Sequence, residues 1–475
     1  MGKRYAKGLF IFHRDLRIID NVGLIQAFTE CEKVYTCFIF TPEQVGFKNA
    51  YRSTNAIRFM IESLSDLSSE IHKHGGELIV LYGKPTTISR VLIQTLDVSA
   101  VYVNKDYSPY AVERDTALAS LCKAQHVAYH ESSDYYLYEP GSITTTTGKY
   151  YQKYTPFYDA VVHRKVEGVY PYYKRHTDTL SKYSGSIPHT ITLAKMFHKY
   201  VGESRRPDYS KYPEMVRGGR AEGTQRLKRA VKEHKQYTKD RDDLVYETTR
   251  LSAYIKFGCV SIREVYHAFV HAYGRSSGLI RELIWREFFA HILYGFPGVL
   301  NGYVYKGIRW RTSRADFQKW QRGNTGVPVV DACMRQMNAT GFMHNRGRMI
   351  VANFLVKTLL INWKWGEEYF AEMLTDYDPA SNNGNWQSVS GTGVDQKPYF
   401  RDMNPWIQSA KADPNAEYIK RWVPELADVA PKEIHKWESS WNDPKHRGIR
   451  YPKPMVIYSE QKEKMLDMYR HAHNQ

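Results

Sequence analysis

Three clusters of polar and aromatic side chains in the second half of the sequence have types and spacings that could do chemistry. The last cluster, "DYDPASNNGNWQSVSGTG" at 376–393, sets two carboxylates, three asparagines, a glutamine and a tryptophan in one short run. Aspartate and asparagine favour turns, so a capped loop is one interpretation. If these groups are buried, they need hydrogen-bonding partners, and the run would then hold something.

The first cluster lies at 245–261, "VYETTRLSAYIKFGCVS". It places Thr248, Thr249 and Ser252 around Arg250 just where a helical pattern begins. Hydroxyl groups, a guanidinium and the free amides of a helix N-terminus together form a phosphate site. An ordinary helix N-cap uses the same residue types, so this stretch alone leaves both interpretations open.

The middle cluster consists of two stripes of residues, each at helical spacing. Glu282, Trp285 and Arg286 are spaced i, i+3 and i+4, and therefore share one helix face. A surface Glu–Arg pair beside a core tryptophan is the simpler explanation of that face taken alone. A second stripe, also explicable as helix surface meeting core, consists of Asn345, Arg348, Met349 and Ala352. Each signal is weak by itself.

Short apolar runs near the N-terminus predict a parallel β-sheet. The runs at 7–13, 34–40, 77–82 and 99–103 are rich in β-forming residues. Between the second and third run, Ile57, Ile61, Leu64, Leu67 and Ile71 recur at helical spacing before Gly75-Gly76. This alternation predicts an open, Rossmann-like α/β domain. The first strand is followed by "HRDLRIIDN", which has no glycine, so a nicotinamide-binding turn is not expected.

We expect three parts along the chain: an α/β domain over 1–135, a connector over 136–205 and an all-α domain over 206–475. The connector is rich in Tyr, Lys, Ser and Pro, which predicts a long segment that packs through its tyrosines. Helical patterns are strongest at 277–295, 329–363 and 366–378, and all ten tryptophans lie at or after residue 285.

Composition restricts the partners. The 67 Lys+Arg against 50 Asp+Glu give a net charge of +17, which attracts polyanions by counterion release, although a solvated basic surface is the alternative. No apolar run approaches a membrane span and no signal-peptide core is found, so we expect a soluble intracellular protein, in cytoplasm or nucleus, without a membrane partner. The five cysteines lack metal-ligand spacing, and no metal site is expected.

These motifs, in this order, resemble those of the photolyase/cryptochrome family over nearly the whole chain. "FHRDLRIIDN" resembles the family's N-terminal motif, and "TTRLS" resembles its flavin-phosphate motif. "ELIWREFF", "TGFMHNRGRM", "LLINW" and "DYDPASNNGNW" resemble its flavin and substrate pocket. The resemblance implies an α/β antenna domain and a helical domain that binds FAD, active as reduced FADH⁻. Folate, deazaflavin, flavin or no antenna chromophore all remain open.

The resemblance also assigns residues to the cofactor. Around the phosphates and ribityl chain it implies Tyr237, Thr248, Thr249, Leu251 and Ser252. Around the isoalloxazine and adenine it implies Arg286, Arg348, Asp376, Asp378 and Asn382. Asn382 would face the flavin N5, and Arg348 and Asp376 would form a buried ion pair beside it. Trp386, Trp363 and Trp310 match the family's electron-transfer chain, although tryptophans of this kind also pack in cores.

In the family's repair enzymes, the damaged dinucleotide flips out of DNA into a pocket beside FAD. The resemblance implies that Glu282 hydrogen-bonds the lesion and that Trp285 packs on it, with Asn345, Arg346 and Met349 completing the pocket. The (6-4) branch has a pair of histidines where Asn345 and Met349 stand here. This pattern is that of cyclobutane pyrimidine dimer photolyases, and a (6-4) photolyase is the weaker alternative.

Three positions depart from the usual pattern or bear on the antenna. Ser388 stands where dimer photolyases have a second pocket tryptophan and DASH-type cryptochromes have tyrosine. A lost stacking partner costs on the order of 1–3 kcal/mol in base binding, so a DASH-type or single-strand-preferring enzyme is an alternative. His13 replaces the usual arginine of the N-terminal motif. Glu113 matches a glutamate that contacts a folate antenna in some members.

The expected function is light-driven repair of cyclobutane pyrimidine dimers in UV-damaged DNA by a monomeric enzyme. Glu282, Asn382, Trp310, Trp363 and Trp386 are the expected catalytic residues. A blue-light photoreceptor is the rival class; it predicts a long C-terminal extension, whereas this sequence ends soon after "YPKPMVIYSEQ". A non-catalytic flavin-binding nucleic-acid module is a third class, which would not need Glu282 and Trp285 together.

Overall fold

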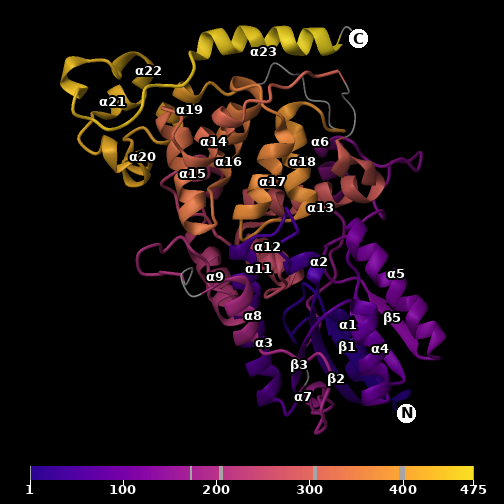
Figure 1. Ribbon diagram of the computed structural model, residues 1–475. Helices are drawn as coiled ribbons and strands as arrows, with labels where there is room; N and C mark the ends of the chain where they lie inside the picture. The colour runs from indigo at the N-terminus through magenta and orange to yellow at the C-terminus, as the bar shows by residue number, and fades with distance from the viewer. Residues whose placement is uncertain (1, 172–173, 203–206, 303–306, 395–401, 474–475) are drawn as a thin grey trace.

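The structure is a computed structural model, and it describes residues 2–171, 174–202, 207–302, 307–394 and 402–473. An α/β part built from the first third of the chain lies at one end of the molecule (Figure 1). A helical part, coloured orange to yellow, lies at the other end. The fold class predicted from the sequence, an open parallel sheet followed by an all-α region, is confirmed.

The described residues form a parallel sheet of five strands in the order β3-β2-β1-β4-β5. The strands are β1 (Tyr5–Phe12), β2 (Cys31–Phe40), β3 (Leu78–Tyr82), β4 (Ala100–Asn104) and β5 (Ala128–Ser132). The first four correspond to the predicted runs. No apolar run indicated β5, because this edge strand, "AYHES", is polar and only half-buried along most of its length.

Helices cover both faces of the sheet, which explains why its strands are apolar throughout. They are α1 (Val22–Glu30), α2 (Pro42–Val45), α3 (Thr54–Lys73), α4 (Pro85–Leu96) and α5 (Pro109–Ala124). Phe10 and Phe12 of β1 pack in one core with α1 and α3, whereas Leu9 and Ile11 pack in another with α4 and α5. The predicted helix before Gly75 is α3, and its five periodic apolar residues are all buried.

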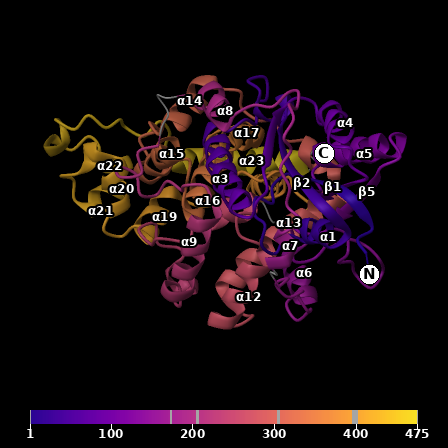
Figure 2. The same cartoon turned by 90° about the horizontal axis from the view of Figure 1, so that it is seen from below.

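The connector packs as predicted through its tyrosines. Its helices are α6 (Tyr154–Val161), α7 (Lys174–Thr177) and α8 (Leu193–Tyr200). Helix α7 contacts α1 of the α/β part, and α6 contacts α13 of the helical part, as can be followed in Figure 2. The buried hydroxyl of Tyr154 donates a hydrogen bond to the Arg281 carbonyl (3.0 Å). The connector thereby ties the α/β part to the helical part.

The helical part contains the remaining elements. Its first helices are α9 (Arg220–Glu233), α10 (Tyr237–Asp240), α11 (Ser252–Lys256), α12 (Ile262–Tyr273), α13 (Gly278–Gly295), η2 (Pro297–Asn301) and α14 (Arg314–Arg322). There follow α15 (Pro328–Thr340), α16 (Asn345–Asn353), η3 (Phe354–Thr358), α17 (Trp363–Met373), α18 (Pro379–Ser390) and α19 (Pro405–Ala412). The chain continues with α20 (Glu417–Trp422), η4 (Pro424–Leu426), α21 (Pro431–Ile434), α22 (Trp437–Ser440), η5 (Pro444–His446) and α23 (Tyr458–His473).

Two sequence interpretations in this part are corrected. The pattern at 329–363 is not one helix, because Gly341 (φ +70°) ends α15 and a separate helix begins at Asn345. The run at 376–393 is not a capped loop, because Pro379–Ser390 form α18 with Asp378 as its N-cap. The Asp378 carboxylate accepts a hydrogen bond from the Ser381 amide (3.0 Å). The helix arranges the amides and the tryptophan on fixed faces.

A fully buried ionic cluster joins the two parts of the chain. Asp134, just beyond β5, accepts hydrogen bonds from Arg17 (2.6 Å) and from Arg263 of α12 (2.7 Å). Arg263 also binds the buried Asp20 (3.1 Å). Burial raises the pKa of Asp134, but the two guanidinium groups outweigh burial and hold the pKa below its ordinary value.

We expect Asp134→Asn to lower the free energy of unfolding by about 3 kcal/mol near neutral pH, because it leaves two buried guanidinium groups short of a carboxylate. A carboxylate whose folded-state pKa is depressed stabilises the fold above its unfolded-state pKa, and the effect is lost as pH falls through the folded-state pKa. Denaturant titrations should therefore show a difference at neutral pH that shrinks in acid. Asp97→Asn is the matched control, since Asp97 pairs with Lys7 at the surface. An equal loss in both variants would contradict the prediction.

Candidate functional site

Arg348, Asp376 and Ser252 meet between α16, α17 and α11. Arg348 Nη2 lies 2.9 and 3.1 Å from the two Asp376 carboxylate oxygens, and the Ser252 hydroxyl donates to the same carboxylate (2.7 Å). Burial raises the pKa of Asp376, but Arg348 and Ser252 more than offset burial, so the net pKa is below the ordinary value. The ion pair expected from the sequence is thus present, and its carboxylate is ionised.

The "TTRLS" segment forms a polar turn, which places Arg250 at φ +50° before the short helix α11. The N-cap interpretation of this segment is wrong, because the N-cap of α11 is Leu251 and no side chain caps it. Thr248, Arg250 and His344 line a cavity of about 300 Å³. The Nε of Arg250 and the Nε2 of His344 are buried there without a hydrogen-bond partner among the described residues.

This cavity fits an anionic group. Unsatisfied buried donors are costly, and a phosphate oxygen is the acceptor that Arg and hydroxyl side chains bind best. Burial and the nearby Arg348 lower the pKa of His344 to about 4, so His344 is neutral and can donate one N–H. Tyr237 lies at the start of α10 and is partly buried. Its ring packs closely on Gly278, where an added Cβ would lie 3.1 Å from the ring.

One face of α13 carries Glu282, Trp285 and Arg286. Each of these side chains contacts a different residue. Glu282 forms an ion pair with Arg241, so the expected Glu282–Arg286 surface pair is wrong. Burial raises the pKa of Glu282, although Arg241 opposes that rise in part. The Trp285 ring is half-buried and stacks on Tyr154 with ring centroids 3.5 Å apart. Tyr154 therefore covers one face of Trp285.

Arg286 is held by Glu287 on its own helix and by Tyr135 of the α/β part. Its Nη1 lies 3.0 Å from the Glu287 carboxylate, and its Nη2 donates to the Tyr135 carbonyl (2.7 Å). Glu287 is fully buried, and it also accepts a hydrogen bond from the Leu137 amide (2.9 Å). Burial raises the pKa of Glu287 to about 7, even though Arg286 lowers it. The sequence did not indicate Glu287, because an acidic residue on an amphipathic helix ordinarily faces water.

The start of α16 is open to solvent. Asn345 is exposed, Met349 is 37% exposed, and Arg346 forms an ion pair with Asp242. On α18, the Asn382 amide donates to the Glu367 carbonyl (3.0 Å), which fixes its side chain toward α17.

Three tryptophans are expected to conduct electrons in the order Trp386, Trp363, Trp310. Their exposure increases in that order. Trp386 is 2% exposed, Trp363 is 3% exposed and Trp310 is half-buried. Trp386 packs against Gly366 of α17, where a Cβ would lie 2.2 Å from the ring. Trp310 contacts Tyr469 of α23, with ring centroids 6.4 Å apart. The role of these rings in electron transfer remains a prediction.

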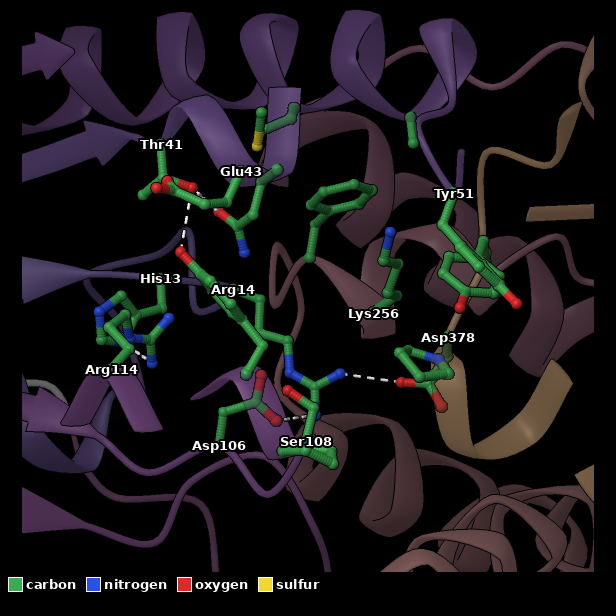
Figure 3. A pocket seen from close by; sticks show the side chains of 18 of the residues that line it. His13, Arg14, Thr41, Glu43, Tyr51, Asp106, Ser108, Arg114, Lys256 and Asp378 are labelled. Atoms are coloured by element: carbon green, nitrogen blue, oxygen red, sulfur yellow. Dashed lines mark hydrogen bonds and ion pairs between the residues drawn. The ribbon is translucent and has the colours of Figure 1, made fainter. Parts of the chain in front are cut away.

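A larger cavity of about 630 Å³ lies at the carboxyl ends of the strands (Figure 3). A crevice at this edge, where the strand order reverses between β1 and β4, is the usual ligand site of such sheets. Its charged lining includes Arg14, whose guanidinium binds Asp106 and Asp378 (both 2.8 Å), as the dashed lines in Figure 3 show. Arg14 thus joins the α/β part to the N-cap of α18.

Two further titratable residues, Lys256 and His13, line this cavity. Burial lowers the pKa of Lys256 to about 8, and its ammonium lies 4.2 Å from the centroid of the Phe257 ring. His13 Nδ1 is 3.1 Å from Arg114 Nη2, and burial and Arg114 lower the pKa of His13 well below its ordinary value. His13 is therefore neutral and accepts from Arg114. From the sequence, His13 was recognised only as a departure from the N-terminal motif, without a role. No sequence pattern indicated Lys256.

In the part of the chain that the structure describes, no group of His, Cys, Asp and Glu is arranged to hold a metal ion. The five cysteines are buried and free. Within the same residue ranges, no helix is both long enough and apolar enough to cross a bilayer.

A Rossmann-like sheet is joined to a helical part in which buried donors without partners line a cavity, an arrangement suited to a large phosphorylated cofactor. The chain matches the DNA photolyase domain over residues 9–171 and the FAD-binding domain of DNA photolyase over residues 279–471. It belongs to the photolyase/cryptochrome family, and it contains that family's FAD-binding domain.

Relatives match along the whole chain. A deoxyribodipyrimidine photo-lyase of Halobacterium salinarum is 33% identical over 98% of this chain and 99% of its own length. A class III photolyase of Agrobacterium tumefaciens is similar with a TM-score of 0.89 and 31% identity, covering 100% of this chain and 99% of that one. An archaeal photolyase of Sulfolobus tokodaii, which holds two FAD molecules, has a TM-score of 0.82 and 36% identity over 98% of this chain and 99% of its own.

We expect Arg348→Ala to weaken FAD binding on the order of 100-fold, about 2.8 kcal/mol, because it leaves the Asp376 carboxylate buried without its cation. Fluorescence titration of the apoprotein with FAD measures the change. Arg470→Ala is the control, since Arg470 forms an exposed pair with Asp467. Unchanged affinity in Arg348→Ala would show that the ion pair does not border the cofactor.

Proposed function

We propose that this protein uses light to repair cyclobutane pyrimidine dimers in DNA. The observation that carries the proposal is the carboxyl group of Glu282, half-buried on the same face of α13 as the Trp285 ring and with its pKa raised. An aromatic surface beside an acid that can donate a hydrogen bond is suited to a flipped pyrimidine dimer, which presents flat bases and carbonyl oxygens.

Different residues of this chain bind different parts of the cofactor. Thr248, Thr249, Leu251, Ser252 and Tyr237 hold the phosphates and ribityl chain of FAD, and Arg348, Asp376 and Asn382 border its rings. The side chains of Arg286 and Asp378, which the resemblance also assigns to the rings, are held by Tyr135 and Arg14. When bound, reduced FAD would supply the light-driven one-electron chemistry that opens the cyclobutane ring without net oxidation or reduction. The Arg348–Asp376 pair contributes a fixed charge pattern beside the flavin.

At the lesion, Glu282 exchanges its Arg241 partner for the dimer; in its protonated form it donates a hydrogen bond to a carbonyl oxygen of the dimer and stabilises the negative charge that develops there. Trp285 packs on the lesion through the part of its ring that Tyr154 leaves uncovered. Asn345, Arg346 and Met349 form the rim on α16, where Arg346 exchanges Asp242 for a backbone phosphate. The net charge of +17 supplies the non-specific attraction to DNA.

A pair of matched oligonucleotides tests the choice of lesion. One carries a single cyclobutane dimer and the other a (6-4) product at the same thymine pair, and each is illuminated with the reduced protein and analysed by chromatography. We expect intact thymines from the first only. Repair of the (6-4) product instead would overturn the proposal. Repeating the first reaction on single-stranded and duplex DNA measures what Ser388 changes.

We further propose that the 630 Å³ cavity takes an antenna chromophore with a planar ring, such as a flavin or deazaflavin. Its aromatic and charged lining suits such a ring, and the Sulfolobus tokodaii relative holds a second FAD. Glu113, the residue that suggested folate, is exposed on α5 and is not among the lining residues. Acid extraction and chromatography of the purified protein would identify the chromophore, and a folate there would contradict this choice.

A further inference from the structure

One face of the Trp285 ring is covered by a tyrosine from a distant part of the chain. Tyr154 is the first residue of α6, which packs against α13 (Figure 1). The two rings are parallel within 4°, and their centroids lie 3.5 Å apart. The indole therefore lies on a flat surface that its own helix does not supply.

Tyr154 is itself held in one place. It is 7% exposed, and its hydroxyl donates a hydrogen bond to the Arg281 carbonyl (3.0 Å). Arg281 lies one helical turn before Trp285, so the hydroxyl is bound to the same turn of α13 that carries the indole. The Tyr154 ring also meets Phe288 edge-on, with centroids 5.9 Å apart. A ring fixed by a hydrogen bond and by core packing can in turn fix its neighbour.

Burial constrains Trp285 less than it constrains the tryptophans of the core. Trp285 is half-buried, whereas Trp320 is 0% and Trp386 is 2% exposed. A half-buried indole can change rotamer unless its neighbours prevent the change. On its own helix, the Phe289 ring lies 5.6 Å away at an angle of 27°. Phe289 and Tyr154 together limit the orientations of the Trp285 ring.

We propose that Tyr154 is a positioning residue for the lesion, and that it acts by holding the Trp285 indole in the orientation that packs on a flipped dimer. The inference rests on the proposed function, since it takes Trp285 as the surface that receives the lesion. A side chain that must be ordered during binding weakens the affinity, whereas a side chain that is already fixed does not. Tyr154 fixes the indole when the protein folds, before DNA arrives.

The expected effect is confined to damaged DNA. A flipped dimer presents the flat surface of its bases to the indole. The bases of undamaged DNA stay stacked in the duplex, and such DNA meets the protein mainly through its phosphates. Loss of the Tyr154 ring should therefore weaken the binding of the dimer and lower the preference for damaged over undamaged DNA.

The test measures the binding of two labelled duplexes to the FAD-containing protein in darkness, by fluorescence anisotropy. One duplex carries a single cyclobutane dimer, and the other has the same sequence without damage. We expect Tyr154→Leu to weaken binding of the dimer about tenfold and to leave binding of the undamaged duplex within about twofold of the wild type. Tyr154→Phe keeps the flat ring and loses only the hydroxyl, so it should stay within about threefold of the wild type on both duplexes.

A double-mutant cycle shows whether Tyr154 acts through Trp285. In Trp285→Leu, which lacks the indole, adding Tyr154→Leu should weaken binding of the dimer no further. Tyr158→Leu is the matched control, because Tyr158 lies one turn further along α6 and its ring faces the Arg281 guanidinium, 4.9 Å away, and not Trp285. This control should bind both duplexes as the wild type does.

A measurement without DNA reports on the indole itself. Protein labelled with 5-fluorotryptophan gives fluorine NMR signals, and the signal that is missing from Trp285→Leu belongs to Trp285. We expect one sharp signal for Trp285 in the wild type and in Tyr158→Leu. In Tyr154→Leu the same signal should be broadened or divided, because the indole then samples more than one rotamer.

Three results would overturn the proposal. Equal binding of the dimer by Tyr154→Leu and the wild type would show that Trp285 needs no support. A loss that persists in the Trp285→Leu background would show that Tyr154 acts elsewhere. A loss shared by both duplexes would show that the variant alters the DNA-binding surface in general.

Two precautions keep these results interpretable. FAD content verifies the fold, and if Tyr154→Leu loses FAD, Tyr154→Met takes its place in the cycle, since methionine fills irregular spaces without a flat face. If the wild type itself does not prefer the duplex with the dimer, the proposed function fails. The fluorine signal still tests the support of Trp285 in that case, so the two failures are distinguishable.

Discussion

Trp386→Phe will slow the blue-light reduction of oxidised FAD at least about 100-fold, which corresponds to about 2.7 kcal/mol in the barrier. Phenylalanine fills the same buried space between Gly366 and Phe370 but gives up an electron far less readily. Because Trp386 is the expected first donor of the three-tryptophan chain, Trp363 and Trp310 cannot compensate for its loss. Absorbance of the flavin under continuous illumination with a thiol measures the rate.

The control for this prediction is a tryptophan that is equally buried but lies outside the expected three-tryptophan chain. Trp437 is 1% exposed and packs on Tyr451 and His446, so Trp437→Phe makes a comparable change in volume. Its photoreduction rate should equal that of the wild type. If Trp386→Phe also keeps the wild-type rate with FAD bound, the electron reaches the flavin from another donor and the assignment of Trp386 is wrong.

Glu282→Ala will lower the quantum yield of dimer repair by one to two orders of magnitude while FAD stays bound. Removing one preorganised hydrogen-bond donor from a site where negative charge develops has effects on the order of 100-fold. Glu282→Gln keeps a donor in the same place and should retain more activity than Glu282→Ala. Single-turnover repair of a defined dimer, with FAD absorbance as the internal standard, compares the three proteins.

The pH dependence of repair gives an independent check on Glu282. Its pKa is raised by burial and only in part lowered again by Arg241, so the carboxyl group stays protonated to higher pH than an ordinary glutamate. The protonated fraction falls as pH rises, and the yield should fall with it in the wild type but not in Glu282→Gln. Loss of FAD in Glu282→Ala would show that Glu282 supports the cofactor instead.

The sequence was most informative where local pattern and tertiary structure agree. The apolar spacing from Ile57 to Ile71 predicted α3, because a stripe of that width has to be buried against the sheet. The Arg348–Asp376 pair was expected from motifs 28 residues apart, and the structure brings the two side chains together. The strand runs of the first 104 residues were recognisable because both faces of each strand are covered.

The rest depends on contacts that sequence spacing does not encode. Arg14 and Asp378 are 364 residues apart, yet their ion pair forms one wall of the larger cavity. Glu282 was expected beside Arg286, one turn away, but its partner is Arg241 on the segment that follows α10. The polar composition of 376–393 also concealed a helix. Asp378 and Pro379 are typical turn residues, but here they are the N-cap and the first residue of α18.

Light-dependent repair is the central claim, and one measurement tests it most directly. The purified protein is reduced, mixed with UV-irradiated oligothymidylate and divided between blue light and darkness, and the recovery of thymine absorbance is followed in both. We predict recovery in the illuminated sample and none in the dark. Equal absorbance in the two samples, with FAD bound and reduced, would contradict the account and favour a photoreceptor.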